Sequence, residues 1–393
     1  MKTMKWKFYS LAFVAGMSIL TACSSDDNND NDGNGGNGNG NEIENGTILK
    51  GTITSDVTLA AGNTYKLSGE YIVEEGATLH IEEGVKIIAV YDDIADYILV
   101  KQGGKINAVG TPDKPIVMTS EKEEPGAWGG IHICGRAHTN AEGGKGSSEI
   151  GGAVYGGNDD ADNSGTLQYI RLEYTGFAFD EEHEANGISF YGVGNGTIVD
   201  HCQAYKGSDD GFEFFGGSVN VSNLVAVSCS DDSFDWTEGW NGKGTNLVAY
   251  QEAESTLGYD CDCLMECDNN GSNNAATPVA HPVLKNLILV GNGGSKQGIR
   301  LRAGTEVEID NAKICGKGQP LTVETALTEN ALKNGTSKLT NITLTAELSS
   351  KDGISTHADF IAVTSNKVDA NLSYSSFEDI KKECSWMNGS WVK

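Results

Sequence analysis

Three short stretches of the chain repeat one pattern: GISFY at residues 187–191, GFEFF at 211–215 and SFDWT at 233–237. Further copies occur at 264–268 and 298–302. In each copy apolar and polar side chains alternate, which is typical of a β-strand with one buried face. A pattern that returns about every 20 to 30 residues indicates a repeat architecture.

Stacking the copies predicts two inward ladders and one outward ladder. The inward ladders are Ile188/Phe212/Phe234/Met265/Ile299 and Phe190/Phe214/Trp236/Cys267/Leu301, and the outward ladder is Ser189/Glu213/Asp235/Glu266/Arg300. A second strand in each repeat aligns Ile170, Cys202, Leu224, Leu287 and Ala312. Short strands of this kind, with turns rich in Gly and Asn between them, predict an all-β solenoid, a single-stranded right-handed parallel β-helix. A β-sandwich is the alternative, but it would not repeat its side chains at a nearly fixed period.

The composition excludes several classes of protein. The chain has 393 residues with 51 Gly but only 6 Pro, so it is neither collagen nor a Pro-rich stalk. Its formal net charge of -27 repels nucleic-acid phosphates and anionic lipid surfaces. We therefore expect no nucleic-acid partner, and we expect cations or neutral, hydroxyl-rich molecules as ligands.

The N-terminus has the features of a bacterial lipoprotein signal. Three lysines precede an apolar run at 8–20, and Cys23 follows small residues. The run is too short to span a bilayer as a mature helix. We predict that residues 1–22 are a signal peptide and that Cys23 is lipidated, an ordinary secretory signal being the alternative.

A flexible linker is predicted at 23–45, because this Asn/Asp/Gly tract cannot bury a core. The β-helix with its C-terminal cap is expected over 46–393. The acidic cluster SSDD at 24–27 resembles the export signal of surface lipoproteins in Bacteroidota, which implies a lipid-anchored protein on the outer face of the outer membrane. We expect the folded part to be monomeric.

Five motifs spread over most of residues 60–300 also match a known family: EEGATLHIEEG (74–84), GGKINAVGTPDKPIVMTS (103–120), GAWGGIHICGRA (126–137), the stretch 155–176 and DDGFEFFGG (209–217). With them the chain resembles the lipid-anchored right-handed β-helix surface proteins of Bacteroidota, within the pectate-lyase-like superfamily. The resemblance implies the fold and the surface location, and it implies no particular reaction. The sequence DCDC at 260–263 departs from the family pattern.

Doubled acids open two successive repeats, SDDG at 208–211 and SDDS at 230–233. In stacked turns Asp209 would lie about 4.8 Å from Asp231, and two carboxylates at that distance repel by roughly 3.5 kcal/mol at an effective dielectric of about 20. A retained proton would suit acid–base catalysis, and a calcium ion between Asp209 and Asp231 would relieve the repulsion as well. The structural alternative is a stack of turns in which Ser and Asp side chains bond their own backbone. The catalytic candidates are Asp209, Asp210, Asp231, Asp232 and Arg300.

The outward ladder predicts an acidic stripe that ends in arginines on one solvent face. In related superfamilies that face is a groove in which a polysaccharide lies, and an aromatic side chain in a turn could stack on a sugar. The alternative is a solvated face whose charges pair between turns. The ligand-binding candidates are Glu213, Asp235, Trp240, Glu266 and Arg302.

Resemblance to polygalacturonases rests on the paired aspartates and on the stretch IRLR at 299–302, but the expected Gly-His-Gly motif is absent. A calcium-dependent lyase would need a basic side chain, for which Arg300 and Arg302 are the local candidates. A further calcium candidate contains Asp160 and Asp162, although Arg171 occupies the position where a closing Glu belongs.

His201 aligns with Asn223 and Asn286, which favours a turn-stacking role over that of a general base. Cys202 and Cys267 fall at core positions. Cys261, Cys263 and Cys267 have a spacing that is unusual for zinc, and the exported setting allows a disulfide instead.

Three hypotheses of function remain. The first is a surface lipoprotein whose acidic groove binds a glycan or another ligand, with calcium as the cofactor to test. The second is a polysaccharide hydrolase or lyase that uses the paired aspartates, and the third is a rigid structural or adhesive element. The C-terminus, with Trp386 and Trp391, is expected to cap the open end of the core.

Overall fold

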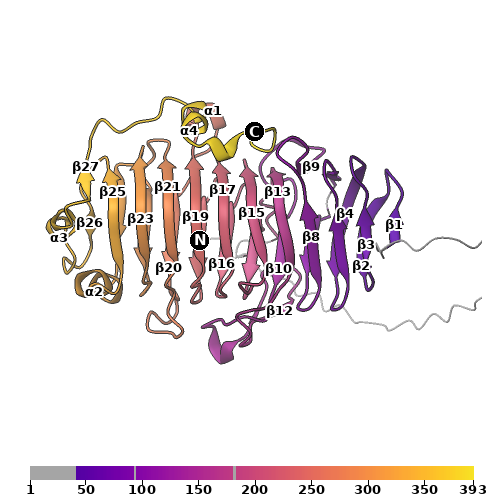
Figure 1. Ribbon diagram of the computed structural model, residues 1–393, viewed down its shortest axis with the longest axis horizontal. Coiled ribbons are helices and arrows are strands. Elements are labelled where there is room, and N and C mark those ends of the chain that lie inside the picture. The colour runs from indigo at the N-terminus through magenta and orange to yellow at the C-terminus, as the bar shows by residue number, and fades with distance from the viewer. Residues whose placement is uncertain (1–40, 93, 180–182) are drawn as a thin grey trace, which may run out of the picture. The chain divides into compact units, whose positions relative to one another are not determined.

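The computed structural model describes residues 41–92, 94–179 and 183–393. Over these ranges the chain winds into a parallel β-helix, each turn stacked on the one before (Figure 1). All pairings within the large sheet are parallel in the described ranges, whereas β11 (Gly146–Ser147) and β12 (Val154–Tyr155) form a small antiparallel hairpin. The predicted all-β parallel β-helix is therefore confirmed. The signal peptide and Cys23 lie outside the described residues.

Each turn of the helix places one short strand on a face that we name face A. Side chains on these strands alternate between the core and the outside, so every second residue can serve a surface site. The face A strands are β7 (Tyr97–Val100), β10 (Ile131–Cys134), β14 (Ile188–Tyr191), β16 (Phe212–Phe215), β18 (Phe234–Thr237), β20 (Met265–Asp268), β22 (Gln297–Arg302), β24 (Gln319–Val323) and β26 (Ser349–Ser350).

The other strand of each turn bends and spans two faces, face B before the bend and face C after it. The residue at the bend has positive φ, for example 53° at His201 and 55° at Asn223, a conformation that Asn tolerates better than most residues. The bent strands are β13 (Gly165–Glu173), β15 (Ile198–Tyr205), β17 (Asn220–Val227), β19 (Lys243–Tyr250), β21 (Val283–Val290), β23 (Glu308–Cys315) and β25 (Lys338–Leu344), and β27 (Lys367–Val368) continues face C.

In the first turns, separate strands form faces B and C. The face B strands are β1 (Asn41–Ile43), β3 (Val57–Leu59), β5 (Thr78–Ile81) and β8 (Lys105–Val109), those on face C are β6 (Lys86–Ala89) and β9 (Ile116–Ser120), and β2 (Ile48–Ile53) and β4 (Thr64–Val73) run from face C onto face A. Asn41 already belongs to the helix, because β1 pairs with β3. The predicted end of the linker at residue 45 is therefore too late.

The predicted core ladders are confirmed by the register of the strands. Ile188 pairs with Phe212, which in turn pairs with Phe234. The ladder of the bent strands is confirmed too, but Leu247 follows Leu224 in it, a turn that the sequence alignment of the repeats omitted. The inward side chains of all turns form one continuous core.

A ladder of asparagine amides runs along the edge between faces B and C. This corner ladder consists of Asn223, Asn246, Asn286 and Asn311. Each of the last three donates from Nδ2 to Oδ1 of the preceding asparagine, over 2.8, 3.0 and 2.9 Å. His201 takes the same corner one turn before Asn223, and its ring stacks 4.4 Å from that of Tyr169. The predicted turn-stacking role of His201 is therefore confirmed.

The C-terminal segment 369–393, which we name the strap, does not cap the core as predicted. It returns along face C, so α4 (Phe377–Glu383) and the end of the chain lie beside the middle strands in Figure 1. The physical reason is that face C is apolar on its outside, and Val227, Val248 and Ile288 pack against the strap.

Both predicted capping residues lie on this strap. Trp391 is fully buried with its ring 6.1 Å from that of Tyr169, and Trp386 lies beside it. The backbone of Lys393 exchanges two hydrogen bonds with the side chain of Gln203. Part of the core at the C-terminal end is instead covered by Phe360 of α3.

The remaining helical segments are short, and within the described ranges none has the length and apolar character that crossing a bilayer requires. They are η1 (Glu142–Gly144), α1 (Glu254–Leu257), α2 (Ala326–Asn334), α3 (His357–Ala362) and η2 (Ser385–Met387). All eight cysteines after Cys23 are buried and free. Cys202 and Cys267 belong to the core as predicted, whereas Cys261 and Cys263 form no disulfide.

Candidate functional site

An acidic cleft of about 390 Å³ opens on face A. Ten carboxylates, one amide and one guanidinium line it: Glu149, Glu184, Asp209, Asp210, Glu213, Asp231, Asp232, Asp235, Asp262, Glu266, Asn186 and Arg300. The volume lies within the range of about 300–1,000 Å³ that is typical of small-molecule sites, but the lining is far more charged than usual.

Doubled acids enter the cleft at the turns that precede β16 and β18. Asp210 accepts the backbone N–H of Asp232 at 2.8 Å through Oδ1, and Asp232 accepts that of Cys263 at 2.6 Å in the same way. One oxygen of each carboxylate therefore bonds the backbone of the next turn, and not that of its own turn as the structural alternative had it. The second oxygen of each has no hydrogen-bond partner in the described part of the chain and is free for a ligand.

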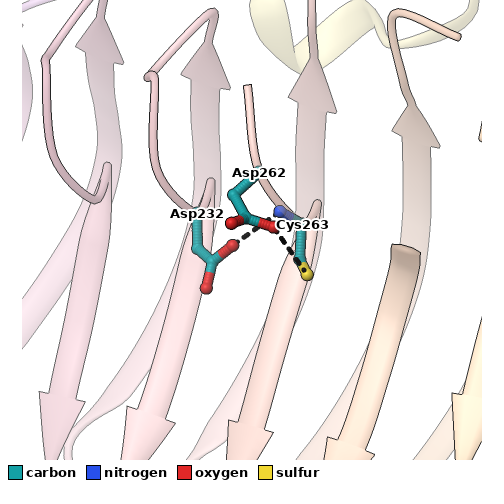
Figure 2. Close-up of side chains that lie close together, drawn as sticks. All are labelled: Asp232, Asp262 and Cys263. Carbon is teal, nitrogen blue, oxygen red and sulfur yellow. Dashed lines mark hydrogen bonds between the residues drawn. The ribbon is translucent and has the colours of Figure 1, made fainter. Parts of the chain in front are cut away.

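Cys263 occupies the next position of this column. Its thiol lies 3.3 Å from Oδ1 of Asp262 and 3.9 Å from Oε1 of Gln297. Figure 2 shows the side chains of Asp232, Asp262 and Cys263 lying close together. A soft sulfur atom thus replaces carboxylate oxygen in this turn, which contains the sequence DCDC at 260–263.

The floor of the cleft is the predicted outward ladder. Glu213 pairs in register with Asp235, Asp235 with Glu266, and Glu266 with Arg300. Successive acids on three neighbouring strands therefore share one side of the sheet. The predicted face is confirmed as a geometric arrangement.

Burial and mutual repulsion raise the pKa values of these acids. Burial, followed by the charge of Asp231, raises the pKa of Asp209 to about 8. Burial, followed by Asp262, raises the pKa of Asp231 to about 6. The pKa of Asp235 is raised well above its ordinary value by burial and then by Glu266. The cleft therefore holds protons at neutral pH when no cation is bound.

Donor atoms in the cleft lie close enough together to hold metal ions. The groups whose donor atoms all lie within 4.8 Å of one another are Asp209/Asp210/Asp231, Asp210/Glu213/Asp235, Asp232/Asp235/Glu266 and Asp232/Asp262/Cys263. Three of these groups contain oxygen donors alone, the set that Ca²⁺ prefers. The predicted proximity of Asp209 and Asp231 is thus found in the structure.

Two buried oxygens in the cleft lack partners among the described residues. Oδ1 of Asp235 and Oδ1 of Asn186 accept no hydrogen bond. Asn186 is only 1% exposed, and its Nδ2 donates to Oε2 of Glu213 over 2.5 Å. A buried acceptor without a donor costs about 1–3 kcal/mol, which a bound cation would recover.

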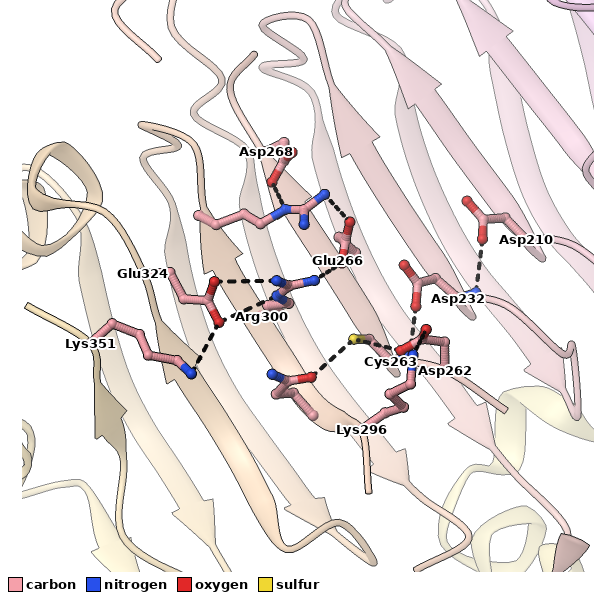
Figure 3. Close-up of polar contacts among 12 residues, drawn as sticks. Asp210, Asp232, Asp262, Cys263, Glu266, Asp268, Lys296, Arg300, Glu324 and Lys351 are labelled. Carbon is pink, nitrogen blue, oxygen red and sulfur yellow. Dashed lines mark hydrogen bonds and ion pairs between the residues drawn. The ribbon is translucent and has the colours of Figure 1, made fainter. Parts of the chain in front are cut away.

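A chain of ion pairs closes one end of the cleft, as Figure 3 shows. Arg300 bonds Glu266 at 2.9 Å and Glu324 at 3.3 Å, and Arg302 bonds Asp268 at 2.7 Å and also contacts Glu266. Although burial acts to lower it, these carboxylates raise the pKa of Arg300 above its ordinary value. The guanidinium therefore keeps its proton, and the structure gives no support to Arg300 as the base of a lyase.

Comparison with family models agrees with this architecture. A model described as a pectate-lyase-like β-helix domain matches residues 51–393. The chain belongs to the pectate-lyase-like β-helix family. Comparisons with curated proteins and with solved structures gave no match. Membership of this family establishes the fold, and the chemistry of this member has to be argued from its cleft.

Three predicted site residues of this pectate-lyase-like β-helix lie elsewhere. Trp240 is 1% exposed and stacks on Phe214 in the core at 4.2 Å, so it cannot stack on a sugar. Its indole turns inward because Gly242 leaves room, since a Cβ there would lie 2.6 Å from Nε1. Asp160 instead lies 2.6 Å from Nδ1 of His138, and buried Asp162 accepts a hydrogen bond from Ser164. Neither aspartate belongs to a metal-binding group of the described residues.

Arg302 lies at the end of the acidic stripe, as predicted, but both of its contacts are ion pairs within the protein. It therefore compensates Glu266 and Asp268 and does not line the cleft.

Four cleft residues of this pectate-lyase-like β-helix, and the neighbouring Cys263, were missed by the sequence analysis. Glu149 comes from the loop between β11 and β12, and Glu184 and Asn186 come from the segment before β14. These segments do not follow the repeat, so no spacing places them at the cleft. Asp262 and Cys263 do follow it, and their alignment with Asp231 and Asp232 could have identified them.

Proposed function

We propose that this protein is a lipid-anchored surface protein of the outer membrane whose acidic cleft binds calcium and, through it, a hydroxyl-rich glycan. The observation that carries the proposal is uncompensated charge. Among the described residues, eight of the ten cleft carboxylates have no ion-pair partner; Glu266 pairs with arginines and Asp262 with Lys296. Such a concentration of buried acid needs protons or a cation for neutrality.

Calcium fits the donors better than other common ions do. It takes six to eight oxygen ligands in flexible geometry, and carboxylate and amide oxygens are abundant in the cleft. Magnesium would need a near-octahedral set and sheds water reluctantly. A calcium ion held by the cleft carboxylates can keep water molecules among its ligands and exchange them for sugar hydroxyls. A protonated cleft carboxyl group without the ion has no such ligand positions.

Calcium binding is tested by titrating the chelator-treated protein with Ca²⁺ in a calorimeter. We expect saturable binding that Asp235→Asn weakens at least about tenfold, because this change removes an unpartnered donor. Asp352→Asn is the matched control, since Asp352 is exposed and belongs neither to the cleft lining nor to its donor groups. Equal binding by all three proteins would remove the cleft from the proposal.

Glycan binding is tested on an array of neutral and uronic-acid polysaccharides, with calcium and with chelator. We expect calcium-dependent retention on hydroxyl-rich glycans. Calcium binding without any glycan retention would leave a structural or adhesive element stabilised by the ion.

The anchor is tested separately by labelling cells with a radioactive fatty acid. We expect the label on the wild type and not on Cys23→Ser, and we expect surface protease to digest the labelled protein. Unlabelled wild type would contradict the lipoprotein proposal without affecting the cleft.

Glycoside hydrolysis is the second candidate, and one observation favours it. Donor atoms of Asp209 and Asp231 lie within 4.8 Å of each other, and their pKa values are raised to about 8 and about 6. At neutral pH the first would be a general acid and the second an ionised nucleophile or base, close to the spacing of about 5–5.5 Å in retaining enzymes. Release of reducing ends that both Asp209→Asn and Asp231→Asn abolish would establish it, and its absence on all glycans would exclude it.

A further inference from the structure

A second pocket lies on another part of the molecule, between the corner ladder and the strap. Its volume is about 350 Å³. The residues that matter for its chemistry are Asn246, Asn286, Asn311, Lys313, Glu383 and Trp386. None of them belongs to the acidic cleft, so the two sites are chemically independent.

Asparagine amides form one wall of this pocket. Asn286 donates to Asn246, and Asn311 donates to Asn286, each through a single N–H. An amide has two N–H groups and two oxygen lone pairs. Each rung of the ladder therefore keeps donor and acceptor capacity after the ladder is satisfied, and Asn286 and Asn311 are exposed.

Trp386 supplies an aromatic surface on the opposite wall. It is partly exposed, and its ring lies 6.2 Å from that of Trp391 and 6.4 Å from that of His201. These contacts fix the indole. Aromatic rings of this kind offer a large apolar face beside a polar edge, which matches the C–H face of a pyranose.

Charged groups at the pocket cancel each other. Lys313 forms an ion pair with Glu383, and the hydroxyl of Tyr374 donates to the other oxygen of Glu383 at 2.8 Å. The pair is held in place before any ligand arrives, and it adds directional hydrogen-bond donors and acceptors without net charge. The pocket therefore favours neither an anion nor a cation.

From this combination we infer that the pocket between the corner ladder and the strap binds a neutral saccharide. One pyranose face would stack on Trp386, and its hydroxyls would bond the amides of Asn286 and Asn311. A purely apolar ligand would displace water from these amides without replacing its hydrogen bonds. The free-energy cost of the unpaired amides would make the pocket reject such a ligand. The site is formed only because the strap returns along face C.

Saturation-transfer NMR tests this inference with a panel of neutral methyl glycosides, namely glucoside, galactoside, mannoside and N-acetylglucosaminide. Glucuronate and glucosamine serve as charged comparisons. We expect saturable binding of at least one neutral glycoside, weakened about tenfold or more in Trp386→Ala and less in Trp386→Phe, because the first change removes the aromatic face and the second keeps part of it. Asn286→Ala should weaken the same glycoside.

Binding should be unchanged in the presence of chelator and in Asp235→Asn, which separates this site from the acidic cleft. The inference is overturned if no neutral glycoside binds, or if Trp386→Ala and Asn286→Ala bind as well as the wild type. Should Trp386→Ala unfold, Asn311→Ala decides, since its side chain lies on the surface and its loss leaves the strap in place.

Discussion

Two polar ladders run along this β-helix, and they behave in opposite ways. In the corner ladder Asn223, Asn246 and Asn286 each donate one hydrogen bond and accept another, and Asn311 donates to Asn286. In the acidic cleft the stacked side chains carry like charges, and only one oxygen of Asp210 and of Asp232 is used to hold the next turn. The same strand spacing therefore allows hydrogen bonds between the asparagines of the corner ladder and brings the carboxyl groups of the acidic cleft close enough to repel each other.

The difference also appears in how each ladder treats a carboxylate. At the start of the corner ladder Asp200 accepts hydrogen bonds from Asn223 and Ser222 and lies 2.8 Å from Nδ1 of His201. Burial acts to raise the pKa of Asp200, but these three neighbours lower it below the ordinary value. In the cleft, burial raises the pKa of Asp209 to about 8, and Asp231 adds to the shift. Where hydrogen-bond donors surround a carboxylate, the repeat stabilises its charge. Where such donors are lacking, the carboxylate remains available for a ligand.

The pH dependence of stability gives the largest expected effect. Below about pH 4 Asp209 is protonated in both the folded and the unfolded state. Between about pH 4 and 8 the folded state holds a proton that the unfolded state releases, so the free energy of unfolding of the calcium-free protein falls as the pH rises through this window. We expect a fall on the order of 3 kcal/mol between pH 5 and pH 8, measured by urea denaturation in chelator.

Asp209→Asn is the control for this titration, since it should flatten the curve and leave the protein more stable at pH 8. Addition of calcium should also restore stability at pH 8. A curve that instead rises steadily from pH 5 to pH 8 would show that the cleft acids are compensated.

Neutralising the column itself gives the next effect. Asp210→Asn with Asp232→Asn keeps an oxygen for each backbone N–H but removes two carboxyl groups whose ionisation is opposed by burial and by neighbouring carboxylates. We expect the double variant to be more stable than wild type by about 2 kcal/mol at pH 8 in chelator, because a carboxylate pair at this spacing repels by several kcal/mol at most. Calcium should no longer stabilise it, as thermal denaturation will show. Lower stability without calcium would mean that the charges are needed for folding.

Removing one asparagine of the corner ladder should lower the free energy of unfolding, by less than the double variant of the cleft raises it. Asn246→Ala deletes the acceptor of Asn286 and the donor to Asn223, and it puts alanine at a φ of 59°. We expect a loss of about 1.5 kcal/mol in the free energy of unfolding. Asn388→Ala is the control, because Asn388 is exposed and has negative φ, and it should change stability by less than about 0.5 kcal/mol.

The smallest effect concerns the edge of the cleft. Lys296 pairs with Asp262 but is about half exposed, so Lys296→Gln should barely alter stability. Because it removes a competing cation, we expect calcium affinity to rise about twofold in calorimetry. Weaker binding would place Lys296 among the residues that orient the site.

Most of the fold could be predicted because each repeat has the same alternation of apolar and polar side chains, and the spacing between repeats hardly varies. The same periodicity placed Asp209 beside Asp231 and Glu213 beside Asp235. It failed where the chain leaves the repeat. Glu149 reaches the cleft on an insertion, and Trp240 turns into the core because a glycine makes space. The strap packs on the apolar outside of face C, a surface that alignment of the repeats predicts to be exposed to solvent.

The strap also changes how the solenoid holds together. In most solenoids each repeat touches only its neighbours, so opening can spread from either end one repeat at a time. Here Lys313 of β23 pairs with Glu383, while Ser390 donates to the carbonyl of Pro112 and Lys393 contacts Glu173 of β13. One short segment thus couples turns that are remote from one another, and amide hydrogen exchange in the middle of the molecule should be slow and cooperative, with fraying confined to the turns outside its reach.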